Sequence, residues 1–343
     1  MLHIVTVYDS LNYGSFFQAH ALQWELEKYG EVTFVDIHHQ STFKQTLKSC
    51  AKKFLKGKFQ SMSLDYRNYK KFSEAKKTFS LTDISKIGSG KDDYFFFGSD
   101  EIWNISREKI KKSKEFFGYG FPEKNRISVA PSINRATIEQ FKDNGYIEEE
   151  LLKFKAISVR DMHTKEVIEQ VVKKECSLVA DPTLMHPKAT YSKYQAKKKA
   201  DNYIMLYTYG MMLNSELKKK IRSFADEKGL KIISVGRWFD FCDENVAALP
   251  SEFLSYVDNA SYIFTDTFHG LMFSLIYEKQ FLVFPCNNIK VEESLKILEL
   301  QERLCMNGNI SESLNNTIDY SLVTPRVKAF GNKTKEFLKN SVE

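Results

Sequence analysis

The stretch LHIVTVYDSLNYGSFFQAHALQWELEKYGEVTFVDI, residues 2–37, carries the signals of a strand, a helix and a second strand in succession. Its apolar run Leu2–Tyr8 predicts the first strand, and Val32–Ile37 predicts the second. Between them, Ser15–Tyr29 predicts a helix that Gly30 ends. A strand–helix–strand unit of this kind places both strands parallel in one sheet, so we expect an α/β fold.

The same alternation continues through the first half of the chain. Further strands are expected at Asp93–Phe97, Arg126–Ala130 and Ala156–Val159, with helices at about 137–153 and 162–173. Residues 186–202 then change from apolar to polar and charged, and they include Pro187 and a run of three lysines, which is typical of a linker.

The second half repeats this pattern. Its predicted strands are Tyr203–Tyr207, Lys231–Val235, Tyr262–Thr265 and Phe281–Phe284, and its predicted helices are 213–228, 251–258 and 268–277. A chain of 343 residues with 43% apolar residues can fill two hydrophobic cores. We therefore predict two Rossmann-like domains with parallel sheets, at 1–187 and 200–343, with the final helix able to pack back on the first domain.

The composition indicates a cytoplasmic protein. The chain runs from Met1 directly into a strand without a basic leader, and no window holds about 18 uncharged apolar residues, so we expect neither secretion nor a membrane span. The five cysteines are scattered and lack a C-x-x-C spacing, so we expect reduced thiols. They are Cys50, Cys176, Cys242, Cys286 and Cys305.

The positive charge is concentrated in one predicted helical insertion. The net charge is +6, and residues 41–78 hold eleven Lys or Arg against two acids, Asp65 and Glu74. Apolar residues recur there at helical spacing between the lysines, at Phe43, Leu47, Cys50, Ala51, Phe54 and Leu55. This pattern fits a solvated helix packed on its own domain, and it also fits a helix on anionic lipid at the inner face of the membrane. We expect no nucleic-acid partner, because no nucleic-acid-binding module is present.

Open parallel sheets bind ligands beyond the carboxyl ends of their strands, so strand-to-helix junctions are the places to search. The first junction holds Asn12, Tyr13 and Gly14. Gly14 permits close approach of the backbone, and Ser15 can cap the helix, whose free N–H groups could hold an anion. A simple tight turn explains these residues equally well.

The second junction, Gly98–Asn104, follows the apolar run Tyr94–Phe97 and contains Ser99 and Asp100. Asp100 is suited to act as a general base, or to cap a helix that follows. The third junction holds Arg160, where a guanidinium is well placed for forked contact with a carboxylate or phosphate. Arg160 could instead pair with Asp161 or Asp181.

The fourth junction, Thr265–Gly270, lies between a strand and an apolar helix. The helix start provides partial positive charge, Thr267 a hydroxyl and His269 a group that titrates near neutrality. This combination suits an anionic ligand that undergoes proton transfer.

Several common site types are not supported. The adjacent His38 and His39 point in different directions along a strand, so we expect no metal site there. No G-x-x-x-x-G-K-[ST], G-x-G-x-x-G or H-E-x-x-H pattern occurs, which argues against a P-loop, a dinucleotide fingerprint and a zincin helix.

Five ordered motifs together resemble the polysaccharide pyruvyltransferase family, over nearly the whole chain. They are Asn12-Tyr13-Gly14 with Gln18–Leu22, Gly98-Ser99-Asp100 with Trp103-Asn104, Ser158-Val159-Arg160, Asp181-Pro182-Thr183, and Thr267-Phe268-His269-Gly270 with Phe273-Ser274. The resemblance implies a GT-B-like architecture with the active site in the cleft between the domains. It also implies phosphoenolpyruvate as donor, no tightly bound cofactor, and a sugar of a cell-surface polysaccharide or its lipid-linked precursor as acceptor. The product would be a pyruvate ketal.

The resemblance also suggests roles for the junction residues. His269 is the candidate acid that protonates the vinyl carbon, and Asp100 is a weaker candidate for accepting the hydroxyl proton. The candidate donor- and substrate-binding residues are Arg160, Thr267, Phe268, Gly270, Asn12, Tyr13, Gly14 and Ser99.

Two positions depart from the family pattern. Another branch of the family reads Arg-Leu-His where this chain has Thr267-Phe268-His269, so an arginine that would grip the donor is absent. Glu101 replaces the usual Gln, which is compatible with a side chain that points away from the ligand. Two other functions therefore remain as alternatives: a GT-B-like glycosyltransferase that uses a nucleotide sugar, and a catalytically silent scaffold in glycan assembly.

Overall fold

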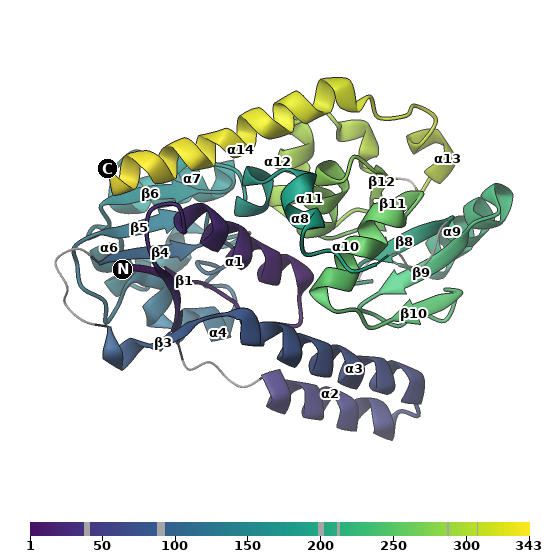
Figure 1. Cartoon of the computed structure of the whole chain (residues 1–343), viewed down its shortest axis with the longest axis horizontal. Coiled ribbons are helices and arrows are strands. Elements are labelled where there is room, and N and C mark those ends of the chain that lie inside the picture. The colour runs from purple at the N-terminus through teal and green to yellow at the C-terminus, as the bar shows by residue number, and fades with distance from the viewer. Residues whose placement is uncertain (38–41, 88–92, 198–201, 211–212, 287, 307) are drawn as a thin grey trace.

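The computed structural model of the chain describes residues 1–37, 42–87, 93–197, 202–210, 213–286, 288–306 and 308–343. Each half of the chain forms its own parallel sheet with helices packed on it, and the two halves lie side by side (Figure 1). The predicted α/β class with two Rossmann-like units is confirmed.

The first sheet has the order β3-β2-β1-β4-β5-β6-β7, and all of its pairings are parallel. Its strands are β1 (Leu2–Val5), β2 (Val32–Asp36), β3 (Leu81–Asp83), β4 (Tyr94–Gly98), β5 (Arg126–Val129), β6 (Ala156–Val159) and β7 (Ser177–Leu178). The helices of this half are α1 (Tyr13–Leu26), α2 (Thr42–Leu55), α3 (Phe59–Ala75), α4 (Glu108–Lys111), α5 (Ile138–Lys142), α6 (Tyr146–Leu151), α7 (Met162–Val172) and α8 (Lys188–Ser192). The strand order reverses between β1 and β4.

The second sheet has the order β10-β9-β8-β11-β12 and is also parallel throughout. Its strands are β8 (Tyr203–Tyr207), β9 (Lys231–Val235), β10 (Glu244–Val246), β11 (Tyr262–Thr265) and β12 (Gln280–Val283). The helices are α9 (Ser215–Lys228), α10 (Pro250–Asn259), α11 (Phe268–Ile276), α12 (Ile289–Ile297), α13 (Ile310–Ser313) and α14 (Tyr320–Val342). Here the order reverses between β8 and β11, so each sheet has one point where a ligand crevice is expected.

Aromatic packing joins the two halves. Tyr13 of α1 stacks on Phe253 of α10 with ring centroids 4.4 Å apart, and Phe17 and Phe253 both pack edge-on against Phe273 of α11. All four rings are buried. Because buried aromatic rings contribute large apolar areas, these contacts hold α1 firmly against the second half.

The last helix returns to the first half (Figure 1). Within α14, the Thr334 hydroxyl donates to the Ala180 carbonyl at 3.0 Å. Near its end, the Ser341 carbonyl accepts a hydrogen bond from the Lys155 ammonium at 2.8 Å. These contacts place α14 against the first sheet although it follows the second in sequence.

Several helix boundaries differ from the predictions. Helix α1 ends at Leu26, so the prediction that Gly30 ends it was wrong. Helix α1 begins at Tyr13 because the Asn12 side chain accepts hydrogen bonds from the N–H groups of Gly14 and Ser15, so the predicted cap at Ser15 was wrong. The single helix predicted at 137–153 is two short helices, α5 and α6. The break contains Gly145, a poor helix former.

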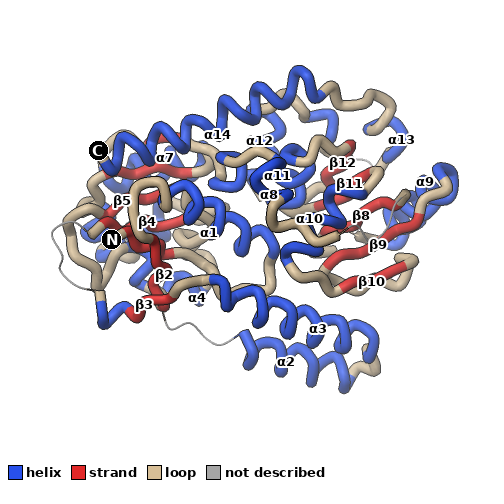
Figure 2. The backbone as a smooth tube through the Cα atoms, in the orientation of Figure 1, coloured by secondary structure: helices blue, strands red, loops and turns tan. Residues whose placement is uncertain are grey.

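The basic insertion forms a helical hairpin rather than one helix (Figure 2). Gly57, with φ of 66°, lies in the turn between α2 and α3, because a left-handed backbone costs glycine little. Asp65 of α3 accepts hydrogen bonds from Ser49 and Lys53 of α2, at 2.9 and 2.6 Å. These bonds fix the two helices against each other.

Candidate functional site

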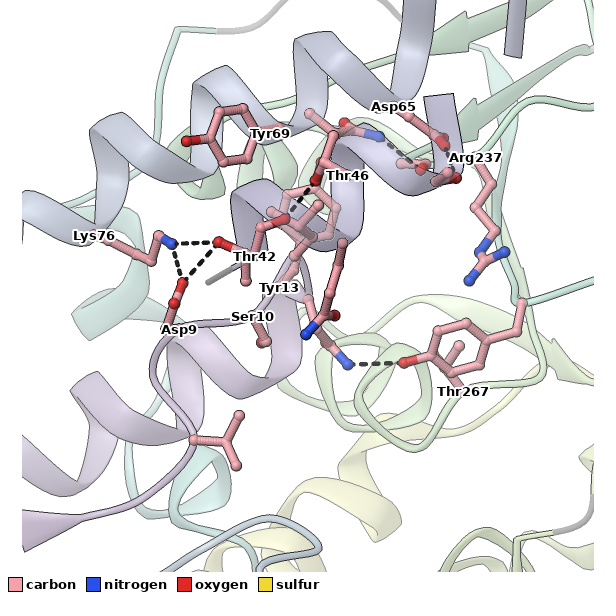
Figure 3. Close-up of a pocket in the computed structure, with 18 of the residues that line it drawn as sticks. Asp9, Ser10, Tyr13, Thr42, Thr46, Asp65, Tyr69, Lys76, Arg237 and Thr267 are labelled. Atoms are coloured by element: carbon pink, nitrogen blue, oxygen red, sulfur yellow. Dashed lines mark hydrogen bonds and ion pairs between the residues drawn. The ribbon is translucent and has the colours of Figure 1, made fainter. Parts of the chain in front are cut away.

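A cavity of about 930 Å³ lies between the two halves (Figure 3). The first half contributes the loop from Thr6 to Tyr13, and the second half contributes Tyr207–Tyr209, Gly236–Phe239 and Thr267. The hairpin adds polar side chains to the same wall. The cavity therefore lies at the carboxyl ends of β1, β8 and β11, where the sheet orders reverse.

A buried cluster of charged side chains lies next to this wall. Arg160 follows β6, Asp181 follows β7 and His269 lies in the first turn of α11. The Arg160 Nη1 is 2.6 Å from the Asp181 Oδ2, and the His269 Nε2 is 3.6 Å from the same oxygen. Arg160 thus pairs with Asp181, one of the two partners expected from the sequence.

The environment of Asp181 keeps it ionised. Burial opposes its charge, but the neighbouring His269 and the Arg160 guanidinium outweigh burial and hold the pKa of this carboxyl well below its ordinary value. Asp181 is 1% exposed, so its charge depends on these two partners rather than on water.

The cluster also has buried nitrogen atoms without hydrogen-bond partners. Among the described residues, Nε and Nη2 of Arg160 and Nε2 of His269 are buried without a hydrogen-bond partner. Buried polar atoms are normally satisfied, and an unsatisfied guanidinium donor is costly. A carboxylate or phosphate group would satisfy the two Arg160 nitrogens in the forked geometry that this side chain favours.

The first and fourth junctions meet at Gly14. A Cβ atom on Gly14 would lie 2.0 Å from the His269 Nδ1, so only glycine lets α1 approach this ring. Asn12, besides capping α1, donates from Nδ2 to the Tyr209 hydroxyl of the second half at 2.7 Å. The junctions predicted separately from the sequence are therefore in direct contact.

Tyr13 lines the cavity and also connects the halves. Its hydroxyl donates to the Ala248 carbonyl at 3.0 Å, and its ring stacks on Phe253. Burial raises the pKa of Tyr13 above its ordinary value, so the phenol stays protonated. Tyr13 shapes the cavity while its hydroxyl is held by the second half.

The second junction joins the cluster through Ser99. The Ser99 hydroxyl lies 3.1 Å from the Asp181 Oδ2 and 3.4 Å from the Arg160 Nη1. Asp100 accepts a hydrogen bond from the Ser15 hydroxyl at 2.5 Å. No helix follows Asp100 directly, since α4 begins at Glu108, so the expectation that Asp100 caps a helix was wrong.

Thr267 and Gly270 form the start of α11. Thr267 is the N-cap residue, and its hydroxyl accepts a hydrogen bond from the Gly270 N–H at 2.9 Å. The adjacent Phe268 ring lies near two cations, with the Arg160 guanidinium 4.6 Å and the Lys290 ammonium 5.4 Å from its centroid. These distances fit cation–π contacts.

Lys290 is a site residue that the sequence reasoning missed. It is 4% exposed, and its ammonium donates to the Glu101 carboxylate at 2.7 Å across the two halves. Burial, together with the Arg160 charge, lowers the pKa of Lys290. Lys290 follows β12 at the start of α12, so a search of one further strand-to-helix junction would have found it.

The pairing with Lys290 also corrects the interpretation of Glu101. This side chain does not point away from the cluster, because it links Lys290 to the second junction. Burial opposes ionisation of Glu101, but Lys290 and then Arg107 outweigh it, so the pKa of Glu101 falls well below its ordinary value. The negative charge that Glu101 adds in place of the usual Gln is therefore paired with the Lys290 ammonium.

A sequence model of the family described as polysaccharide pyruvyl transferase matches residues 12–288. The chain belongs to this family. The matched range includes all four junctions and Glu101, and it stops just before Lys290. No curated protein matches the sequence significantly.

Solved structures show which fold this pyruvyl transferase family member has. A UDP-GlcNAc 2-epimerase from Neisseria meningitidis aligns with a TM-score of 0.53 at 6% identity, over 99% of this chain and 98% of that one. The UGT89C1 protein of Arabidopsis thaliana aligns with a TM-score of 0.52 at 12% identity, over 99% and 98%. Trehalose-6-phosphate synthase OtsA aligns with a TM-score of 0.51 at 7% identity, over 99% and 96%. The fold is therefore of the GT-B type, as expected.

Metal-binding clusters and membrane-spanning helices are both absent from the described part of this family member. No group of three or more His, Cys, Asp or Glu side chains among these residues is arranged to hold a metal ion. The pair His38 and His39 lies outside the described residues. None of the described helices has both the length and the apolar composition needed to cross a bilayer.

Proposed function

We propose that the chain transfers the pyruvyl group of phosphoenolpyruvate to two hydroxyls of one sugar, in a cell-surface polysaccharide or its lipid-linked precursor. The product is a cyclic pyruvate ketal, and inorganic phosphate is released. No tightly bound cofactor is required, because the donor itself supplies an activated enol and a leaving group.

The observation that carries this proposal is the unsatisfied guanidinium of Arg160. Its Nε and Nη2 are buried donors without a partner, and the buried Lys290 cation lies beside the same Phe268 ring. Phosphoenolpyruvate carries a phosphate and a carboxylate close together. Two neighbouring cations match this pair of anions, and Lys290 takes the role expected of the arginine that is absent at Thr267.

The reaction requires one proton donor and one acceptor. His269 protonates the vinyl C3 of the donor. The first sugar hydroxyl adds to C2, and its proton passes to Asp100. Transfer of this proton from Asp100 to His269 then restores the acid. The bond from C2 to the phosphate oxygen then breaks. The second hydroxyl adds to C2, and its proton leaves with the phosphate. The Asp181 carboxylate, 3.6 Å from Nε2, stabilises the charged imidazole before the first step.

Calorimetric titration with phosphoenolpyruvate tests donor binding, and NMR in D₂O tests the chemistry. Wild-type protein should bind the donor and, with an acceptor, form a ketal methyl group that carries one solvent deuterium. We expect His269→Gln to lower the transfer rate by about 10² to 10⁴. Arg160→Lys should weaken donor binding by about tenfold or more, because a lysine cannot make the forked contact.

His163→Gln is the matched control. The ring of His163 is bonded to the Ala136 carbonyl and belongs to none of the contacts described above, so donor binding and rate should not change. Binding of a nucleoside diphosphate without binding of phosphoenolpyruvate would instead support the glycosyltransferase alternative. Binding of neither would support the scaffold alternative.

A further inference from the structure

The outer side of the α2–α3 hairpin exposes an apolar stripe. Along α2, Phe43, Leu47 and Phe54 recur at helical spacing and are 44%, 47% and 58% exposed. Leu55 is 85% exposed, and Phe59, just after the turn, is 55% exposed. Large apolar side chains that gather on one helix face in this way usually mark an interaction surface.

A row of lysines runs beside this stripe. Four exposed lysines follow one another at intervals of four residues, three in α2 and the last directly after its end: Lys44, Lys48, Lys52 and Lys56. None of them has an acidic partner among the residues that the structure describes. We call the apolar stripe and the lysine row together the α2 face.

The other side of the hairpin belongs to the cavity. Thr42, Thr46 and Ser49 of α2 and Asp65 of α3 line it, and Lys76 contacts Asp9 and Thr42 at its edge (Figure 3). Helix α3 lies between α2 and the second half (Figure 1), where its Asn68 side chain donates to the Gly236 carbonyl at 2.8 Å. Helix α2 therefore contributes residues both to the cavity wall and to the α2 face.

We propose that the α2 face docks the protein on an anionic phospholipid bilayer. Phe and Leu side chains can enter the boundary between headgroups and acyl chains, while the lysine row contacts the negative headgroups. Binding of the α2 face to a bilayer does not depend on whether the protein transfers pyruvyl groups. If the proposed function also holds, docking brings lipid-linked sugars to the cavity.

Two other occupants fit this face less well. A second copy of the same face, packed symmetrically, would bring two rows of lysines together, and like charges repel. A nucleic acid would neutralise the lysines but would leave Leu55 and Phe54 in water. An anionic bilayer has negative headgroups for the lysine row and an apolar interior for the apolar stripe.

Flotation of the full-length chain with lipid vesicles tests the proposal. We expect binding to vesicles of phosphatidylcholine mixed with phosphatidylglycerol, little binding to phosphatidylcholine alone, and weaker binding at high salt. The double variants Phe54→Gln/Leu55→Gln and Lys52→Gln/Lys56→Gln should each weaken binding by about tenfold or more. Thermal unfolding should be unchanged, which separates lost docking from lost folding.

Matched substitutions on α14 serve as controls. Leu322→Gln replaces a leucine that is 60% exposed, and Lys328→Gln/Lys333→Gln removes two exposed lysines, so vesicle binding should stay at the wild-type level. Equal binding of all variants, or none by the wild type, would overturn the proposal. So would a dimer in sedimentation that Leu55→Gln dissociates, because this would assign the α2 face to self-association.

Discussion

The charged cluster between the halves and the α2 face both combine cations with aromatic rings, but they differ in exposure. Lys290 is 4% exposed, and Glu101 holds it in one position beside Phe268. The lysines of the α2 face lie in water. A buried charge depends on each fixed partner, whereas exposed charges are individually weak and act together. The effect of single substitutions should therefore differ sharply between the two regions.

The largest effect is expected from Asp181→Asn. This change leaves the Arg160 guanidinium buried without its counter-ion, and breaking such a pair costs about 3–5 kcal/mol of unfolding free energy. Urea denaturation followed by circular dichroism measures the loss. Asp226→Asn is the control, because Asp226 lies in an exposed ion pair with Arg222. Equal stability of the two variants would mean that Asp181 is not needed to compensate the buried cations.

Helix α1 carries a buried histidine that should make the stability of the protein sensitive to acid. His20 is packed on Phe79, its Nε2 lies 3.0 Å from the Thr78 hydroxyl just after α3, and burial lowers the pKa of His20 from 6.5 to about 4. Between these pH values the unfolded chain binds a proton that the folded chain does not. Stability is therefore complete above pH 6.5 and falls as the pH drops toward 4, by at most about 3 kcal/mol.

His20→Gln should flatten this part of the pH profile of the unfolding free energy. Chemical denaturation at a series of pH values measures it, and the α2-face variant Lys52→Gln/Lys56→Gln should keep the wild-type slope. An unchanged slope in His20→Gln would show that another group causes the acid sensitivity.

Gly14→Ala tests the close contact between α1 and His269. The new methyl group overlaps the imidazole ring, so we expect a loss of about 1–3 kcal/mol together with weaker donor binding. Gly145→Ala is the control, because nothing lies within 4 Å of a Cβ atom there. Thermal unfolding measures the stability of both variants, and calorimetry measures their donor binding. Unchanged donor binding in Gly14→Ala would mean that His269 does not contribute to the donor site.

The smallest effect is expected at the α2 face. Leu55 is 85% exposed, so Leu55→Gln should change the unfolding free energy by less than about 0.5 kcal/mol. Urea denaturation checks this. A large loss of stability would mean that the leucine packs against the protein, and the contrast between the two regions would then disappear.

Much of this molecule could be predicted from local sequence signals. Apolar runs such as Val32–Ile37 and Tyr262–Thr265 identified buried parallel strands, and their ends located the junctions that carry Arg160 and His269. Helix ends were less predictable, because Asn12 and Ser15 are both good capping residues and only the backbone geometry selects Asn12.

Contacts between distant residues could not be predicted in this way. The Lys290–Glu101 pair joins positions 189 residues apart, and the partner of Arg160 depends on the side-by-side arrangement of β6 and β7. No local pattern records such a pairing. Gly14 is a similar case. Only glycine fits at this position, because the ring of His269, 255 residues later in the chain, leaves no room for a side chain.

The position of α14 has a consequence for folding during synthesis. Ribosomes make proteins from the N-terminus, so the strands of the first sheet are exposed to the cell long before Tyr320–Val342 exists. The hydrogen bond from Thr334 to Ala180 and the bond from Lys155 to Ser341 form only after the second half is made. The half that is synthesised first therefore cannot complete its packing until the last helix of the chain has been made.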